Sequence, residues 1–181
     1  NNGGDGLAIS RLLSLRGYHV ETFVVRGSTN ESKDFGINFN QLSKLNSVHE
    51  ISSESDFPLI SDKEIIIDAM FGSGLARPLK GLYAETINYI NASMVKVISV
   101  DLPSGLYCDD VAKDTTIIKA NYTITFQTPK LSFFLPANYP YVGIWEVVNI
   151  GLSKAYISKC VSHYATLELD EITQKLLTKN K

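Results

Sequence analysis

The stretch "EIIIDAMFGSG", residues 64–74, decides the fold class, because three isoleucines run into an aspartate and a glycine-rich loop follows. A second apolar run, "VKVISVD" at residues 95–101, also ends in an acid. Between them, "LYAETINYI" at residues 82–90 has the apolar spacing of a helix. Apolar strands without alternation, joined by a helix, are typical of a parallel sheet that is buried on both faces. We therefore predict an α/β fold with a mostly parallel sheet.

The segments on either side extend this pattern. Residues 7–16 have helical spacing, with Gly17 as a stop signal and an apolar face made of Leu7, Ala8, Leu12 and Leu15. Further strands are predicted at residues 19–25, 48–51, 122–126 and 143–150. A polar loop at residues 26–34 and a short helix at residues 39–45 separate the first two of these strands. The tail, residues 166–181, is predicted as either a last helix or a linker.

The composition is that of one ordinary globular domain: 181 residues, of which 44% are hydrophobic and 20% charged. A net charge of -2 provides no general attraction to nucleic acid or to acidic membranes, so neither is expected as a partner. No apolar run approaches the roughly 18 residues that a membrane span requires. Two cysteines, Cys108 and Cys160, are too few for a disulfide framework and fit a reducing compartment. We therefore expect a cytoplasmic location.

The opening residues, "NNGGDG", form the first candidate ligand loop. Glycines allow backbone N–H groups to approach a ligand closely, and the N-terminus of the following helix carries partial positive charge. This combination suits a phosphate group. The same pattern is equally typical of a plain helix N-cap with turn glycines.

Two further candidate loops follow the apolar strands. In "DAMFGSGLARPLKG", Asp68 closes the strand, Gly72 and Gly74 free the loop, and Arg77 supplies a positive charge that suits phosphate. In "SVDLPSG", Asp101 closes the second strand before a turn. Ligands of open α/β sheets collect beyond the carboxyl ends of the strands. We therefore predict that the two acids lie at the ends of adjacent strands and share one crevice with the opening loop.

In order and spacing, "NNGGDG", "DAMFGSGLARPLKG" and "SVDLPSG" resemble the YjeF N-terminal domain, the NAD(P)HX epimerase family. The later stretch from Phe126 to Leu152 is also similar, so the resemblance covers residues 1–152. It implies a Rossmann-like three-layer α/β/α sandwich from which the first strand and helices are missing. It also implies that residues 153–181 are a C-terminal extension or a linker, because many bacterial relatives carry a fused ADP- or ATP-dependent dehydratase.

The family interconverts the R and S epimers of NADH or NADPH hydrated at C6 of the nicotinamide ring. By resemblance, Asp101 is the catalytic acid/base, and a potassium ion is bound by Asn2, Asp68 and Ser104. The resemblance also implies a homodimer. The residues that it places around the NADHX or NADPHX substrate are Asn1, Asn2, Gly3, Gly4, Asp5, Gly72, Ser73, Gly74, Leu75, Ala76, Arg77, Pro78 and Asp101.

Two other functions remain open at this point. The fold also serves as a non-catalytic nucleotide-binding or protein-interaction module in some eukaryotic relatives, although this chain keeps Asn2, Asp68, Asp101 and Ser104. A P-loop kinase is disfavoured because no G-K-[ST] loop is present. Several other residues are predicted to have structural or surface roles: His19, His49, His163, Cys108, Phe133, Phe134 and Trp145. Lys130 is expected near the site without a catalytic role.

Overall fold

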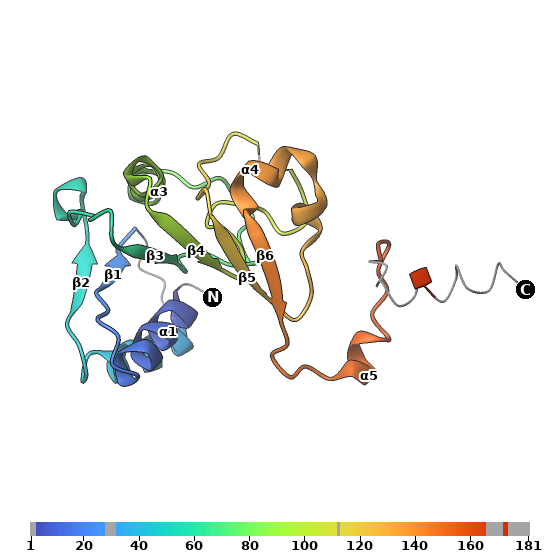
Figure 1. The fold of residues 1–181 in the computed structure, drawn as a ribbon, viewed down its shortest axis with the longest axis horizontal. Helices are drawn as coiled ribbons and strands as arrows, with labels where there is room; N and C mark the ends of the chain where they lie inside the picture. Colours follow the sequence, from blue (N-terminus) through green and yellow to red (C-terminus); the bar gives the residue numbers. More distant parts are fainter. Residues whose placement is uncertain (1–2, 28–31, 112, 166–171, 174–181) are drawn as a thin grey trace, which may run out of the picture. The chain divides into compact units, whose positions relative to one another are not determined.

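The computed structural model describes residues 3–27, 32–111, 113–165 and 172–173 (Figure 1). The chain divides into two compact units, Asn1–Ile150 and Gly151–Lys181. The domain boundary predicted from the sequence lies after residue 152. The strands that the structure describes and the candidate loops belong to the first unit.

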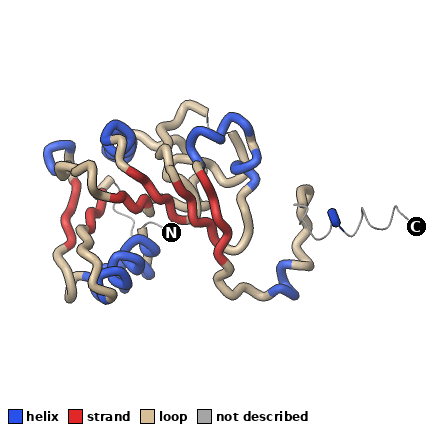
Figure 2. Tube along the Cα trace, in the orientation of Figure 1, coloured by secondary structure: helices blue, strands red, loops and turns tan. Residues whose placement is uncertain are grey.

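The first unit mixes helices and strands along the chain, and β4 leads to β5 through a loop without a helix, as Figure 2 shows. Its regular elements are α1 (Gly4–Leu15), β1 (Thr22–Val25), α2 (Lys33–Leu42), β2 (Val48–Ile51), β3 (Ile65–Asp68), α3 (Leu82–Ser93), β4 (Lys96–Val100), β5 (Tyr122–Phe126), α4 (Tyr139–Val142) and β6 (Ile144–Val148). Short 3₁₀ turns cover Glu54–Asp56, Leu131–Phe134 and Pro136–Asn138.

The described strands form two parallel sheets. β3, β4, β5 and β6 lie side by side in that order, and β1 pairs separately with β2. Around β1 and β2, the helices α1 and α2 contribute Leu7, Phe35 and Leu42 to a core that also contacts Val24 and Val48. Helix α3 lies on the other side of the strands from α1 (Figure 1). The predicted α/β class and the parallel strand direction are confirmed.

One face of the four-stranded sheet packs against α3. Its core joins Ile87 of α3 to Val97 of β4, and Ile66 of β3 packs against that cluster. Because alternate residues of a strand point to opposite faces, Asp68 shares the face of Ile66. The register then continues this row from Asp68 through Ser99 and Thr123 to Trp145.

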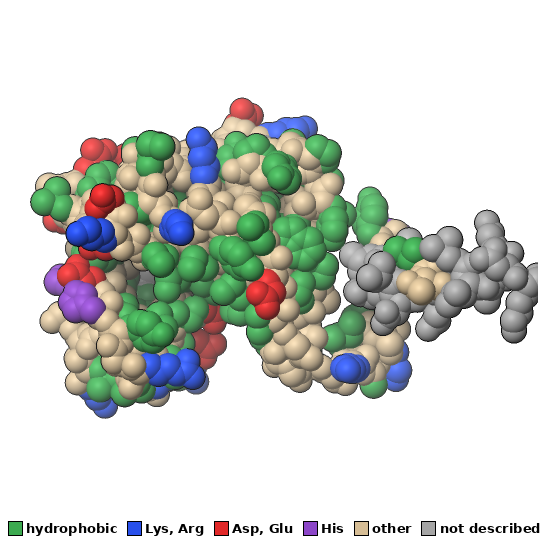
Figure 3. All heavy atoms as spheres, viewed as in Figure 1, with side chains coloured by type: hydrophobic (Ala, Val, Ile, Leu, Met, Phe, Trp, Pro, Cys, Tyr) green, Lys and Arg blue, Asp and Glu red, His purple; other side chains and the backbone are tan. Residues whose placement is uncertain are grey.

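The prediction that the isoleucine strand is buried on both faces is wrong. A row of apolar residues, Ile67, Ile98, Tyr122 and Ile144, crosses the opposite face of the four strands. Ile67 is 39% exposed and Ile144 is 66% exposed. Hydrophobic side chains gather over this sheet in Figure 3. The physical reason is that α3 covers only one face, and the other described residues leave these side chains accessible.

Helix α1 begins inside the glycine-rich opening. Gly3 has a φ of 80° and Gly4 is the first helical residue. The helix ends as predicted at Gly17, whose N–H and that of Tyr18 bond back to the last turn. The predicted apolar face is only partly correct. Leu7 is buried, but Leu12 and Leu15 are 47% and 60% exposed, and neither belongs to the core of Leu7, Phe35 and Leu42.

Other element boundaries also differ from the sequence prediction: α2 ends at Leu42 and not at residue 45, and β6 covers Ile144–Val148 and not residues 143–150. Helix α2 starts at Lys33 and not at residue 39, because the Ser32 hydroxyl accepts the Phe35 N–H at 3.1 Å and caps the helix. The predicted loop at residues 26–34 is correspondingly shorter. Strand β1 starts at Thr22, where pairing with Val48 begins, and not at residue 19.

In the described part of the second unit, residues Lys154–Ile157 form the short helix α5, which is capped by the Ser153 hydroxyl. Of the predicted tail element at residues 166–181, only residues 172–173 lie within the described part, and both are helical. Among the described residues, no helix is long and apolar enough to cross a membrane.

Candidate functional site

Asp68, the last residue of β3, is held by polar groups from β4 and from the loop that follows β4. Ser99 lies opposite Asp68 in the strand register and donates its hydroxyl to Oδ2 at 2.8 Å. Ser104 donates its backbone N–H to Oδ2 at 2.8 Å and its hydroxyl to Oδ1 at 2.5 Å. The carboxylate therefore fastens the end of β3 to the predicted "SVDLPSG" loop.

The Asp68 side chain is buried, and no described Lys, Arg or His lies within ion-pair distance of it. Burial raises the pKa of this carboxyl above its ordinary value, although the hydrogen bonds from Ser104 and Ser99 favour the ionised form. A buried carboxylate of this kind gains most from a cationic partner. Its neighbour, the Ser104 hydroxyl, adds a second oxygen, and oxygen donors suit a hard cation.

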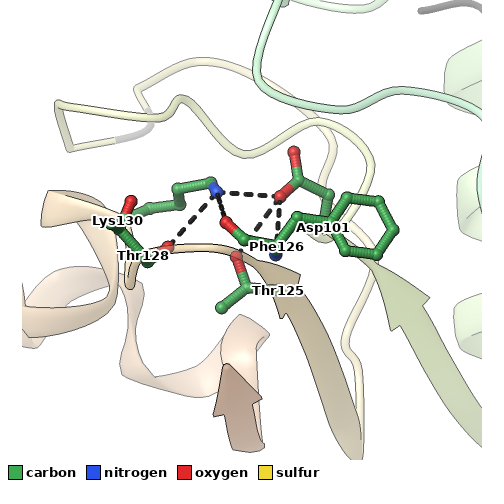
Figure 4. A network of polar contacts seen from close by, with 5 residues as sticks. All are labelled: Asp101, Thr125, Phe126, Thr128 and Lys130. Atoms are coloured by element: carbon green, nitrogen blue, oxygen red, sulfur yellow. Dashed lines mark hydrogen bonds and ion pairs between the residues drawn. The ribbon is translucent and has the colours of Figure 1, made fainter. Parts of the chain in front are cut away.

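Asp101 directly follows β4, and its backbone has a φ of 66°, in the left-handed region. Its N–H donates to the carbonyl of Ile124 at 2.7 Å and extends the pairing with β5. Three donors converge on Asp101 Oδ1: Lys130 Nζ at 2.8 Å, the Phe126 N–H at 3.2 Å and the Thr125 hydroxyl at 3.3 Å (Figure 4). Among the described residues, none hydrogen-bonds to Oδ2. One carboxylate oxygen is thus anchored, and the other remains available.

The loop after β3 lies against both acids. The Phe71 N–H donates to the Ser104 hydroxyl at 3.0 Å. A Cβ placed on Gly72 would lie 3.4 Å from Asp101 Oδ2, so the loop backbone passes close to the available oxygen. A turn closes with the Leu75 N–H on the Gly72 carbonyl at 3.4 Å. In the rest of the predicted phosphate loop Leu75 is half-buried, and the exposed residues are Ser73, Gly74, Ala76, Arg77 and Pro78.

The opening loop reaches the same place. A Cβ on Gly3 would lie 3.8 Å from the Ala69 carbonyl oxygen, and one on Gly6 would lie only 2.9 Å from the Ala69 side chain. The N-terminus of α1 therefore packs on the residue that follows Asp68. Gly4 is buried and Asp5 is half-buried at this N-terminus. Asn1 and Asn2, which the sequence assigns to substrate and cation, lie outside the described residues.

The three predicted loops thus converge at the carboxyl edge of the four-stranded sheet. Asp68 and Asp101 end the neighbouring strands β3 and β4, as predicted. This position follows from the fold, because parallel strands bring their carboxyl ends to one edge.

Sequence reasoning missed the contacts of three residues in this network: Ser99, Thr125 and Lys130. A signal was present for each. Ser99 and Thr125 are polar residues inside strands whose neighbours are apolar, and Lys130 follows the carboxyl end of β5. All parallel strands end at the same edge, so a polar residue after any of them is a candidate for the site, as Asp68 and Asp101 are.

Cys108 lies near the Asp101–Lys130 pair, and the thiolate form of a cysteine is a nucleophile. Burial, followed by the charge of Asp109, raises the pKa of the Cys108 thiol to about 11. The thiol is therefore protonated at neutral pH, which opposes nucleophilic chemistry.

The other residues predicted to be structural or at the surface are either packed in the core, as Phe133 is beside Leu102 and Leu106, or exposed. His49 stacks on Phe23 at 5.2 Å between β1 and β2. A surface hollow of about 470 Å³ is lined by Phe133, Phe134 and other apolar residues, and none of the predicted site residues lines it. Phe133 belongs to the core, whereas Phe134 and Trp145 are 48% and 36% exposed.

The fold and the site define a Rossmann-like α/β domain with a polar site at the carboxyl edge of its parallel strands. Residues 1–132 match the family model of the YjeF-related protein N-terminus. The chain belongs to this family. It is 37% identical over 149 residues to the NAD(P)H-hydrate epimerase of Limosilactobacillus reuteri, a match that spans 82% of this chain and 68% of that protein.

Two other similarities extend this comparison. The bifunctional NAD(P)H-hydrate repair enzyme of Thermofilum pendens is 37% identical over 135 residues, which cover 72% of this chain and 26% of that enzyme. The crystal structure of yeast ynu0 superposes with a TM-score of 0.67 and 21% identity, and the match covers 94% of this chain and 71% of the yeast chain. At this identity the yeast structure shows the fold alone.

Proposed function

We propose that this chain is an NAD(P)HX epimerase, which interconverts the R and S epimers of hydrated NADH and NADPH. The observation that carries the proposal is the position of Asp101, whose Oδ2 faces the Gly72 loop while Oδ1 is anchored. The similarity to proteins named NAD(P)H-hydrate epimerase supplies the substrate class.

Asp101 is proposed as the group that moves the proton at the C6 oxygen of the substrate. C6 carries a hydroxyl and the ring nitrogen, so it is a hemiaminal carbon. In one route the carboxyl gives its proton to the C6 hydroxyl, which leaves as water, and a second water adds to either face of the planar iminium and returns a proton to the carboxylate. In the other route the carboxylate takes the hydroxyl proton as the C6–N bond breaks, which gives an aldehyde at C6 and an electron pair on the ring nitrogen, and the carboxyl passes the proton to that nitrogen. The aldehyde turns about the C5–C6 bond, the nitrogen adds to its other face, and the proton returns to the C6 oxygen. Both routes need one carboxyl oxygen that is positioned and accessible.

A potassium ion is the proposed cofactor. Asp68 and Ser104 would hold it, with Asn2 as the third side chain. The support is the chemistry of the donors: a buried carboxylate without a cationic partner among the described residues, next to a hydroxyl oxygen. When bound, the ion would balance the charge of Asp68 and fasten together the loops that meet there.

The dinucleotide is proposed to lie across the loops at the same edge. The N-terminus of α1 carries partial positive charge and adjoins Ala69, which suits a phosphate group. Arg77 is exposed and adds a full positive charge from the second loop. Gly72 allows the substrate ring and its loop to approach Asp101 closely.

We also propose that the protein forms a homodimer. The apolar face of the four-stranded sheet supports this, because Ile67, Ile144 and Val148 are 39%, 66% and 38% exposed there. Exposed apolar patches of this kind mark interaction surfaces. Sedimentation velocity over a range of concentrations tests the proposal, and a monomer at every concentration would contradict it.

The direct test of the function is an epimer assay. Purified R and S forms of NADHX are incubated separately with and without the protein, and the two forms are separated by chromatography over time. An epimerase shortens the equilibration of both forms toward the same ratio. Equilibration at the spontaneous rate, with binding of the dinucleotide retained, would favour the non-catalytic binding module.

A further inference from the structure

Lys130 is enclosed by the network in Figure 4, and its ammonium group has three acceptors. Nζ lies 2.8 Å from Asp101 Oδ1, 3.0 Å from the Phe126 carbonyl and 3.3 Å from the Thr128 carbonyl. An ammonium group has three N–H donors, so these contacts use all of them. The Lys130 side chain is only 11% exposed. Its charge is therefore directed inward, at Asp101 and at the end of β5.

The partner of this charge is the anchored oxygen of Asp101. Lys130, the Phe126 N–H and the Thr125 hydroxyl all approach Oδ1, and the Asp101 side chain is 13% exposed. A carboxylate held at one oxygen by several donors cannot rotate freely. The remaining oxygen, Oδ2, is consequently held toward the loop at Gly72.

We infer that Lys130 is a positioning residue for the epimerase reaction: it anchors Asp101 Oδ1 so that Oδ2 faces the substrate loop. This inference rests on the proposed function, because it assigns Lys130 a role through Asp101. Lys130 has no donor left for a substrate phosphate, since its three N–H groups already have acceptors within the protein. The charge of Lys130 also offsets the cost of placing a carboxylate where water has little access.

The backbone around this pair needs such an anchor. Asp101 and Gln127 both have a φ of 66°, a left-handed backbone conformation that residues with a side chain rarely adopt. Strained positions of this kind persist only when surrounding contacts hold them. Lys130 spans both strand ends, because it bonds to Asp101 after β4 and to the last residue of β5.

The test measures kcat and KM for Lys130→Met, Lys130→Gln and Lys130→Arg in the full chain. We expect kcat of Lys130→Met to fall by about 10²-fold with KM nearly unchanged, because a misplaced catalytic group costs a factor of this order. Lys130→Arg, which keeps the charge, should retain more activity than Lys130→Gln, which keeps only a donor. Lys96→Met is the matched control, because Lys96 is exposed at the start of β4 and should show wild-type kinetics.

A double-mutant cycle separates positioning from substrate contact. In the Asp101→Asn background, Lys130→Met should lower kcat by less than about twofold, because residues that act as a unit are non-additive. An equal loss in both backgrounds, or a raised KM with kcat unchanged, would overturn the inference. If Lys130→Met does not fold, as judged by circular dichroism, Lys130→Gln replaces it, and wild-type kcat in that variant would also overturn it. A wild-type chain that does not epimerise would instead overturn the proposed function.

Discussion

Ser104 donates twice to Asp68, through its backbone N–H at 2.8 Å and through its hydroxyl at 2.5 Å. The same hydroxyl accepts the Phe71 N–H at 3.0 Å. One small side chain therefore joins the end of β3, the loop after β3 and the loop after β4. These are the segments that carry the candidate carboxylates and the proposed phosphate loop.

The first prediction concerns this contact. Ser104→Ala should lower the free energy of unfolding by about 1–3 kcal/mol, because it leaves a buried Asp68 oxygen and the Phe71 N–H with poorer partners. Urea unfolding followed by circular dichroism measures the change. Ser73→Ala is the control, since Ser73 is exposed on the loop. A Ser104→Ala protein as stable as the control would show that the contact contributes little.

The second prediction concerns potassium. A bound ion stabilises the folded state by mass action, by about 1.4 kcal/mol when its concentration is ten times the dissociation constant. The unfolding temperature should therefore be higher in potassium chloride than in tetramethylammonium chloride at equal ionic strength. Asp68→Asn should abolish the difference and weaken dinucleotide binding. Equal unfolding temperatures and equal activity of the wild type in the two salts would refute the cation site.

The third prediction concerns catalysis. Asp101→Asn should slow epimerisation by roughly 10²–10⁴-fold, the factor typical of losing a general acid/base. The fold should persist, because asparagine tolerates the left-handed backbone of this position and nearly matches aspartate in shape. The rate of R-to-S conversion at saturating substrate, less the spontaneous rate, is the measurement. Full wild-type speed would remove Asp101 from the mechanism, and a large loss of binding would indicate a positioning role.

The fourth prediction concerns the turn after Asp101. Gly105 has a φ of 97°, and a Cβ at this position would lie 2.1 Å from the Thr116 carbonyl oxygen. Gly105→Ala should therefore cost at least about 2 kcal/mol, since strain and backbone collision add. Gly74→Ala is the matched control, because a Cβ there meets no atom within 4 Å. Similar unfolding free energies for the two variants would contradict the prediction.

The fifth prediction concerns pH and Cys108. Its folded pKa of about 11 exceeds the ordinary 9.0, so the folded state keeps the proton between these values. The contribution of this thiol to stability should then fall as the pH rises through that window. Alkylation of Cys108 by iodoacetamide should still be accelerating at pH 10, as followed by mass spectrometry with Cys160 as the exposed reference. A rate that is half-maximal near pH 9 for Cys108 would contradict the raised pKa, and Cys108→Ser should remain active.

Local sequence patterns predicted the positions of much of the regular structure. The isoleucine strand, the helix at residues 82–93 and the strands at 96–100 and 122–126 all appear close to where the apolar spacing placed them. The patterns were less informative about α2, because its start depends on one hydroxyl cap at Ser32. They also could not show that α3 covers only one face of the sheet, which leaves Ile67 and Ile144 exposed. Burial depends on neighbours that are distant in the chain.

The sequence by itself determined that two acids close two parallel strands, because an apolar run, a helix and a second apolar run impose that order. Only the tertiary structure decided how the acids differ. Asp68 is enclosed by Ser99 and Ser104, whereas Asp101 is paired with Lys130 and keeps one oxygen toward Gly72. Periodicity describes which face of a strand a residue occupies. The direction of a side chain beyond the strand end depends on the pairing of β4 with β5 and on a left-handed backbone, and apolar spacing records neither.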